Sequence, residues 1–132
     1  YLDAKEKKYI DECGAANFFG IKNNTYVTPL STSILPSITN MSLMTLAREM
    51  GLKVTRRHIR VEEMTEMKEA AACGTACVIS PISKVFDPDK NITYSFGDQP
   101  GPILTRLYKA LQDIQYGRAE DKHNWCTIID KN

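Results

Sequence analysis

The chain has 132 residues, of which 42% are hydrophobic and 25% are charged, and its formal net charge is +1 at pH 7. This length suffices for one domain with its own core, and the composition is ordinary for a globular protein. A net charge this close to zero argues against general attraction to nucleic acids or membrane surfaces, and no apolar run approaches the roughly 20 residues of a membrane helix. We therefore expect a globular protein with no nucleic-acid partner and no membrane partner.

A hairpin is the first predicted element. Residues 17–21 (NFFGI) are typical of a short buried strand, and residues 22–24 (KNN) are typical of a turn. Residues 25–28 (TYVT) are β-branched and aromatic, which predicts a return strand that Pro29 ends. Glu12 precedes this hairpin, and its carboxylate needs a partner if it is buried; a strand-edge salt bridge or cap would supply one.

Residues 31–51 (STSILPSITNMSLMTLAREMG) form the segment around which the chain is organised. Residues 31–33 are hydroxyl residues suited to a turn that hydrogen-bonds its own backbone, and Pro36 disfavours helix before it. Apolar residues at spacings of three and four then predict an amphipathic helix from Ser37 that stops at Gly51. The first backbone N–H groups of such a helix lack partners, so residues 37–39, with the Ser37 and Thr39 hydroxyls, could bind a phosphate. Most helices that begin this way, however, simply have a good N-cap.

Strands and helices are expected to alternate through the rest of the chain. Residues 53–59 predict a strand and residues 61–72, which are rich in Glu, Met, Lys and Ala, predict a helix. The charged side chains of this helix are expected to face solvent and the methionines to fill the core; they are Glu62, Glu63, Glu66, Lys68 and Glu69, and Met64, Met67 and nearby Met50.

Gly74 is expected to end this helix in a helix-to-strand turn. Residues 76–85 predict a buried strand interrupted at Pro81, residues 92–96 a short strand, and the apolar spacing from Ile103 to Ile114 a helix that ends at Gly117. Residues 125–129 predict a last strand. The alternation indicates an α/β fold.

The four cysteines, Cys13, Cys73, Cys77 and Cys126, are irregularly spaced, and the charged residues 1–12 are not expected to be a secretory signal. We expect reduced, structural thiols and a cytoplasmic location. Cys73 and Cys77 have no His partner nearby in the sequence, so no metal site is predicted.

Three motifs carry a resemblance to a known family. They are DECGAANFF at residues 11–19, the segment at residues 31–51, and CGTAC at residues 73–77. In this order they resemble the branched-chain amino acid aminotransferases, which are pyridoxal 5'-phosphate enzymes of class IV. The resemblance runs from Tyr1 to Trp125. It implies the α/β fold of the larger C-terminal domain of the D-amino-acid-aminotransferase-like enzymes (fold type IV), with a mixed sheet and flanking helices.

The resemblance also implies roles for six residues. Glu12 would bond the pyridine nitrogen of the cofactor, Leu35 would pack against its ring, and Ile38 and Thr39 would hold its phosphate. The backbone N–H groups of Thr75 and Ala76 would bind the substrate carboxylate, which agrees with the ability of a Gly-led turn to present successive N–H groups to an anion.

Three positions depart from the family pattern. Ser37 stands where the family usually has Gly, which requires a negative φ or tolerated strain. Asn40 stands where Arg is common. Ser80 replaces the second cysteine of the Cys-x-x-Cys redox pair that some members carry, so Cys77 cannot form that pair.

The lysine that forms a Schiff base with the cofactor would lie before Tyr1, so the resemblance implies no catalytic residue within this chain. The sequence starts without Met, and we expect residues 1–132 to be the C-terminal cofactor-binding portion of an enzyme whose small N-terminal domain is absent. The whole enzyme would move the amino group of leucine, isoleucine or valine to 2-oxoglutarate, as a homodimer; the chain alone would be inactive. The alternatives are a D-amino-acid aminotransferase or aminodeoxychorismate lyase of the same fold, or a non-catalytic binding or assembly module.

Overall fold

The computed structural model describes residues 1–129. It contains eight strands, two α-helices and one 3-10 helix, in this order along the chain: β1 (Glu12–Cys13), β2 (Ala16–Lys22), β3 (Thr25–Pro29), α1 (Ile38–Glu49), β4 (Lys53–Arg57), η1 (Val61–Glu66), β5 (Glu69–Gly74), β6 (Val78–Pro81), β7 (Lys84–Asp87), β8 (Ile92–Ser95) and α2 (Pro102–Gln115). The α/β class predicted from the alternation is confirmed.

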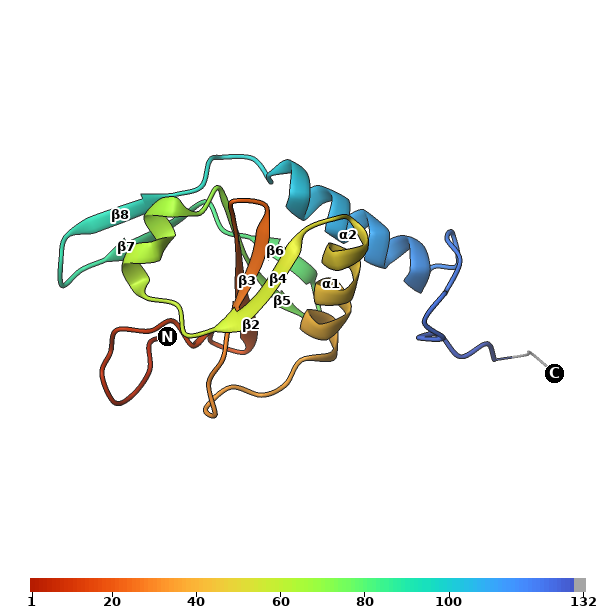
Figure 1. Cartoon of the computed structure of the whole chain (residues 1–132), viewed down its shortest axis with the longest axis horizontal. Helices are drawn as coiled ribbons and strands as arrows, with labels where there is room; N and C mark the ends of the chain where they lie inside the picture. The colour runs from red at the N-terminus through yellow and green to blue at the C-terminus, as the bar shows by residue number, and fades with distance from the viewer. Residues whose placement is uncertain (130–132) are drawn as a thin grey trace.

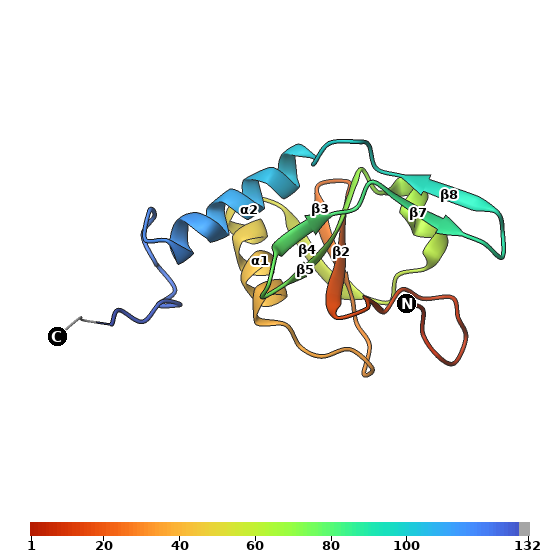
Figure 2. The same ribbon diagram turned by 180° about the vertical axis from the view of Figure 1, so that it is seen from behind.

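The main sheet is mixed, with the strand order β4-β3-β2-β5-β6 and with β1 paired to β2. Strands β3 and β4 run parallel and are joined through α1, whereas the other pairs are antiparallel. Strands β7 and β8 form a separate hairpin. Both α-helices lie on one side of the main sheet, and the β7–β8 hairpin and η1 lie toward the other (Figures 1 and 2).

The β2–β3 turn has the local chemistry that its sequence predicted. Asn23 and Asn24 adopt φ values of 47° and 56°, a left-handed geometry that asparagine tolerates better than most residues. Lys22 and Thr25 then pair directly across the two strands. This two-residue connection sets the register of the hairpin.

The sheet buries a different core on each face, because successive side chains of a strand point to opposite sides. Phe19 and Ile21 of β2 join the core under the helices, together with Leu43 and Leu46 of α1 and Leu107 of α2. The neighbouring Phe18 points the other way. It belongs to a second core, which includes residues from β3, the β4–η1 connection, η1, β5 and β8. In that order, examples are Val27, Ile59, Met64, Ala70 and Tyr94.

The two predicted α-helices are confirmed, whereas the helix expected at residues 61–72 is wrong. Only residues 61–66 are helical, as η1, and residues 69–74 form strand β5. Strand β5 lies between β2 and β6 and pairs with both. The small apolar run from Ala70 to Cys73 suits a strand covered on both faces, and this tertiary setting outweighs the helix propensity of Ala and Glu.

The prediction that Glu69 faces solvent is therefore wrong, since only 5% of this residue is exposed. The assignment of Met64 and Met67 to the core is confirmed. Gly74 ends a strand, so the turn after it joins two strands instead of a helix and a strand.

The strand expected at residues 125–129 is absent. These residues have no regular secondary structure, and Ile128 and Ile129 are exposed. Although their composition is typical of a strand, they pair with no other strand in the part of the chain that the structure describes. Among residues 1–129, no helix has both the length and the apolar character needed to cross a membrane.

Candidate functional site

The N-terminal turn of α1 presents free backbone donors. Ser37 is the N-cap, and its side-chain oxygen accepts the Asn40 N–H at 3.1 Å, while its carbonyl accepts the Met41 N–H at 3.0 Å. Within residues 1–129, neither the Ile38 N–H nor the Thr39 N–H donates a hydrogen bond. Free donors and the positive end of the helix dipole together suit an anion.

Serine fits the N-cap without strain. Its φ is −107° and its ψ is 123°, an extended conformation that any residue adopts. The departure from glycine at Ser37 therefore keeps the turn and adds a side-chain cap.

The loop before α1 is shaped by its own hydroxyl groups and by one anchor. The Ser33 N–H donates to Ser31 Oγ at 3.1 Å, which is the self-bonded turn predicted from the sequence. Ile34 is buried, whereas the next side chain, Leu35, is 83% exposed. Leu35 is therefore free to pack against a ligand ring that enters from outside.

Asn17 joins three parts of the site, and sequence reasoning did not single it out. In β2 it pairs with Glu12 of β1 on one side and with Cys73 of β5 on the other. Its side-chain Nδ2 donates to the Leu35 carbonyl at 3.3 Å. The asparagine inside the DECGAANFF motif was visible in the sequence, but its partners come from distant segments.

Glu12 is half-buried in β1, and its carboxylate makes no hydrogen bond or ion pair within the described residues. With Phe18 and Val85 among its neighbours, it lines a cavity of about 300 Å³. A half-buried carboxylate without a partner favours a proton-bearing or cationic group beside it.

Thr75 and Ala76 lie in the tight turn between β5 and β6, which Gly74 and Val78 close as a pair. Both are exposed, and neither backbone N–H donates a hydrogen bond within residues 1–129. The turn lies beside the N-terminal end of α1 in both views (Figures 1 and 2). Two sets of free N–H groups, each suited to an anion, therefore occur at the same end of the sheet.

The amine of Lys22 lies away from these groups. Lys22 is at the opposite end of β2 from Asn17. Its Nζ pairs with Glu66 at 2.6 Å and with Glu63 at 3.5 Å, and these carboxylates raise the pKa of the ammonium group. A more firmly protonated amine is a weaker nucleophile.

All four cysteines are free thiols. Cys73 is fully buried, and burial raises the pKa of its thiol to about 12, so it is an inert core residue as predicted. Cys77, predicted to be structural, is exposed, and its sulfur accepts a hydrogen bond from Ser80 Oγ at 3.1 Å.

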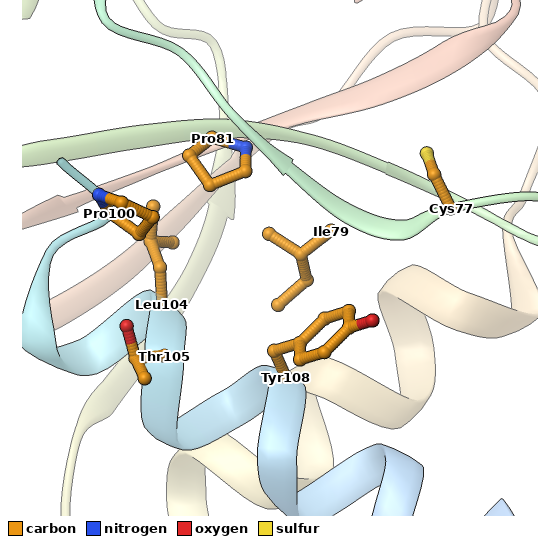
Figure 3. Close-up of a pocket in the computed structure, with 7 residues that line it drawn as sticks. All are labelled: Cys77, Ile79, Pro81, Pro100, Leu104, Thr105 and Tyr108. Atoms are coloured by element: carbon orange, nitrogen blue, oxygen red, sulfur yellow. The ribbon is translucent and has the colours of Figure 1, made fainter. Parts of the chain in front are cut away.

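A cavity of about 310 Å³ lies next to the β5–β6 turn, between β6 and α2 (Figure 3). Ile79 and Pro81 form its sheet side, Leu104 and Tyr108 form its helix side, and Cys77 lies at one end. None of the six predicted site residues lines it. It is therefore a neighbour of the site and not part of it.

A family model described as "Amino-transferase class IV" matches residues 4–85 of the chain. A branched-chain-amino-acid aminotransferase from Helicobacter pylori is 47% identical over 127 residues, which is 95% of this chain and 36% of that protein. One from Haemophilus influenzae is 40% identical over 132 residues, covering 98% of this chain and 38% of that protein. The resemblance inferred from the three motifs is confirmed, and the chain spans less than two fifths of these relatives' lengths.

Solved structures agree with the fold. The Escherichia coli branched-chain amino acid aminotransferase superposes with a TM-score of 0.80 and 32% identity, over 94% of this chain and 39% of that one. The enzyme from Thermobaculum terrenum, solved in its PLP form, has a TM-score of 0.80 and 32% identity, over 96% of this chain and 40% of that one. The expected fold, the mixed-sheet α/β fold of these aminotransferases, is thereby confirmed.

Proposed function

Because the chain belongs to the class IV aminotransferases, we propose that it carries cofactor-binding and substrate-binding elements of a branched-chain amino acid aminotransferase. The observation that carries the proposal is that, within residues 1–129, the backbone N–H groups at Ile38–Thr39 and at Thr75–Ala76 donate no hydrogen bond and belong to segments that meet at one end of the sheet. Asn17 connects this end to the Glu12 carboxylate, which makes no hydrogen bond or ion pair within residues 1–129. An aminotransferase needs to bind a cofactor phosphate, a substrate carboxylate and a ring nitrogen, and these groups match those needs in charge.

The residues of the chain fit pyridoxal 5'-phosphate. The Ile38 and Thr39 N–H groups and the Thr39 hydroxyl would bind the phosphate, and the exposed Leu35 side chain would cover one part of the ring. Glu12 would accept a hydrogen bond from the protonated ring nitrogen and keep the proton there. When bound, the cofactor supplies the electron sink for cleavage of the substrate Cα–H bond.

On the substrate side, the N–H groups of Thr75 and Ala76 would bind the α-carboxylate and orient the amino acid. Two donors in one rigid turn fix both the position and the direction of a carboxylate. Neither group changes its protonation state, so their contribution is positioning.

We propose further that the whole enzyme transfers the amino group of leucine, isoleucine or valine to 2-oxoglutarate and acts as a cytoplasmic homodimer. In this proposal the lysine that bonds the cofactor, and the small domain, belong to the part of the relatives that this chain does not match. The 132-residue chain then binds pyridoxal 5'-phosphate reversibly and shows no transaminase turnover.

A titration with pyridoxal 5'-phosphate tests this function. Absorbance would follow binding, and borohydride reduction with mass analysis would detect any covalent adduct. We expect reversible binding that Thr39→Val weakens about tenfold, since a hydroxyl bond to a charged oxygen contributes about 1.5 kcal/mol. Thr45→Val is the matched control, because this threonine lies in the same helix with its hydroxyl donated to the Met41 carbonyl.

Two results would contradict the proposal. A single reduced adduct on one lysine of this chain, or turnover above background, would mean that the chain carries its own catalytic amine. Equal weakening by Thr39→Val and Thr45→Val would remove the phosphate role of the α1 N-terminus.

A further inference from the structure

Asn40, in the first turn of α1, points its amide into the protein. Only 5% of this residue is exposed. The Tyr26 hydroxyl donates to Asn40 Oδ1 at 2.6 Å, and Asn40 Nδ2 donates to Thr28 Oγ1 at 3.0 Å. The Thr28 hydroxyl in turn donates to the Phe18 carbonyl at 2.8 Å.

These bonds form one continuous buried network from the sheet to the helix. Tyr26 and Thr28 both belong to β3, and Phe18 belongs to the adjacent β2. The Tyr26 ring is held in place by stacking on Phe19, with centroids 4.4 Å apart. Burial raises the pKa of the Tyr26 hydroxyl well above its ordinary value, so it stays protonated and keeps donating.

The backbone of Asn40 also holds the first turn of α1 together. The Asn40 N–H is bound by Ser37 Oγ at 3.1 Å. Ile38 and Thr39, whose N–H groups are free, therefore lie between two residues that are bonded to each other. In this turn, the Asn40 side chain is bonded to the sheet. The Ile38 side chain is 80% exposed and does not anchor the turn.

We propose that Asn40 is a positioning residue for phosphate binding: its buried amide fixes the first turn of α1 to strand β3, so that the Ile38 and Thr39 N–H groups are held in place for the phosphate. The inference rests on the function proposed above and adds a residue that does not touch the ligand. A site stays preorganised only when the groups behind it are themselves locked by packing and hydrogen bonds. Without the Asn40 amide, the buried Tyr26 hydroxyl would lose the acceptor that it contacts at 2.6 Å, and we expect the turn to shift in response.

The test compares two ligands that differ only in the phosphate. Pyridoxine 5'-phosphate and pyridoxine share the ring and lack an aldehyde, so neither forms covalent adducts with lysines. Calorimetric titration of the 132-residue chain would give both affinities. We expect Asn40→Leu, which keeps the branching of the side chain at Cγ, to weaken pyridoxine 5'-phosphate about tenfold while changing pyridoxine by less than about twofold.

Two further variants separate positioning from a loss of stability. Tyr26→Phe removes one bond to Asn40 and keeps the ring stack; we expect the same selective loss, at about threefold, and this variant carries the test if Asn40→Leu does not fold. Leu46→Ala is the matched control, because it removes buried contacts from the same helix two turns away. It should lower the melting temperature and leave the ratio of the two affinities unchanged.

The outcomes distinguish this inference from the function on which it rests. If Asn40→Leu and Tyr26→Phe weaken both ligands equally, as a structural defect would, Asn40 does not position the phosphate site although the proposed function stands. If the wild-type chain binds pyridoxine 5'-phosphate no more tightly than pyridoxine, the proposed phosphate site fails and this inference fails with it.

Discussion

At the scale of single residues, Glu63 shows how several weak contacts combine. Its two carboxylate oxygens accept hydrogen bonds from the Arg57 guanidinium at 2.9 and 2.7 Å, and Oε1 also accepts the Arg60 N–H at 3.2 Å. Lys22 lies 3.5 Å from Oε2. The bond from Arg57 is the largest cause that lowers the pKa of Glu63 from 4.5 to about 2, because a paired carboxylate resists protonation.

This pKa predicts a specific loss of stability in acid. The folded-state pKa is lower than the unfolded one, so the stabilisation is complete above pH 4.5 and is lost as the pH falls through 2. We expect Glu63→Gln to be about 1 kcal/mol less stable than the wild type at pH 7, and this difference should shrink as the pH falls from 4.5 through 2. Urea unfolding at several pH values would measure this.

The exposed Glu6, 3.6 Å from Lys8, supplies the control for this prediction. Glu6→Gln should leave the pH profile unchanged. A constant difference between Glu63→Gln and the wild type from pH 7 to pH 2 would mean that the ion pair is not its source.

At the scale of elements, the N-terminus of helix α2 is capped by a carboxylate from strand β5. Gly101 is its N-cap and offers no side chain, but the Glu69 carboxylate of β5 accepts the Ile103 N–H at 3.1 Å and the Leu104 N–H at 2.8 Å. A negative charge at a helix N-terminus satisfies free donors and complements the dipole. This contact explains why Glu69 is buried and what it stabilises.

We predict that Glu69→Ala lowers the free energy of unfolding by about 2 kcal/mol, at the upper end for a lost cap, because the half-buried Ile103 N–H and the buried Leu104 N–H both lose their acceptor. Gly101→Ala should also destabilise, since a Cβ atom there would lie 2.1 Å from Glu69 Cδ. Chemical denaturation would measure both. The exposed Glu62, which pairs with Lys90, is the control, and a Glu62→Ala loss as large as that of Glu69→Ala would contradict the capping role.

At the scale of the whole molecule, strand β2 holds the two cores together. Phe18 and Phe19 are adjacent in the chain, yet they belong to different cores on opposite faces of the sheet. Gly20 allows the close approach that the second core needs, since a Cβ atom there would lie 2.3 Å from Met67 Sδ. The two cores share the same backbone ladder, so neither face can open without disturbing the other.

We therefore predict a single unfolding transition for the wild type and for Phe18→Leu and Phe19→Leu. Each substitution should cost about 1–2 kcal/mol, because it leaves a gap in a packed core. Calorimetry would give equal calorimetric and van't Hoff enthalpies if the transition is two-state. Two resolved transitions, with one variant shifting only one of them, would show that the cores unfold independently.

Local sequence determined the elements whose signals are local. The helix after Ser37, the self-bonded turn at Ser31 and the left-handed Asn23–Asn24 turn all follow from residues within a few positions of one another. The three motifs likewise indicated the family, because each is a contiguous run.

Tertiary structure decided the features whose partners are distant in the chain. Residues 69–74 became a strand because β2 and β6 pair with them. Within residues 1–129 no strand pairs with residues 125–129, which remained irregular. Asn17 and Asn40 gained their roles from partners 18 and 14 positions away. A buried polar group takes whichever partner the fold brings within hydrogen-bonding distance, and neither propensity nor periodicity contains that information.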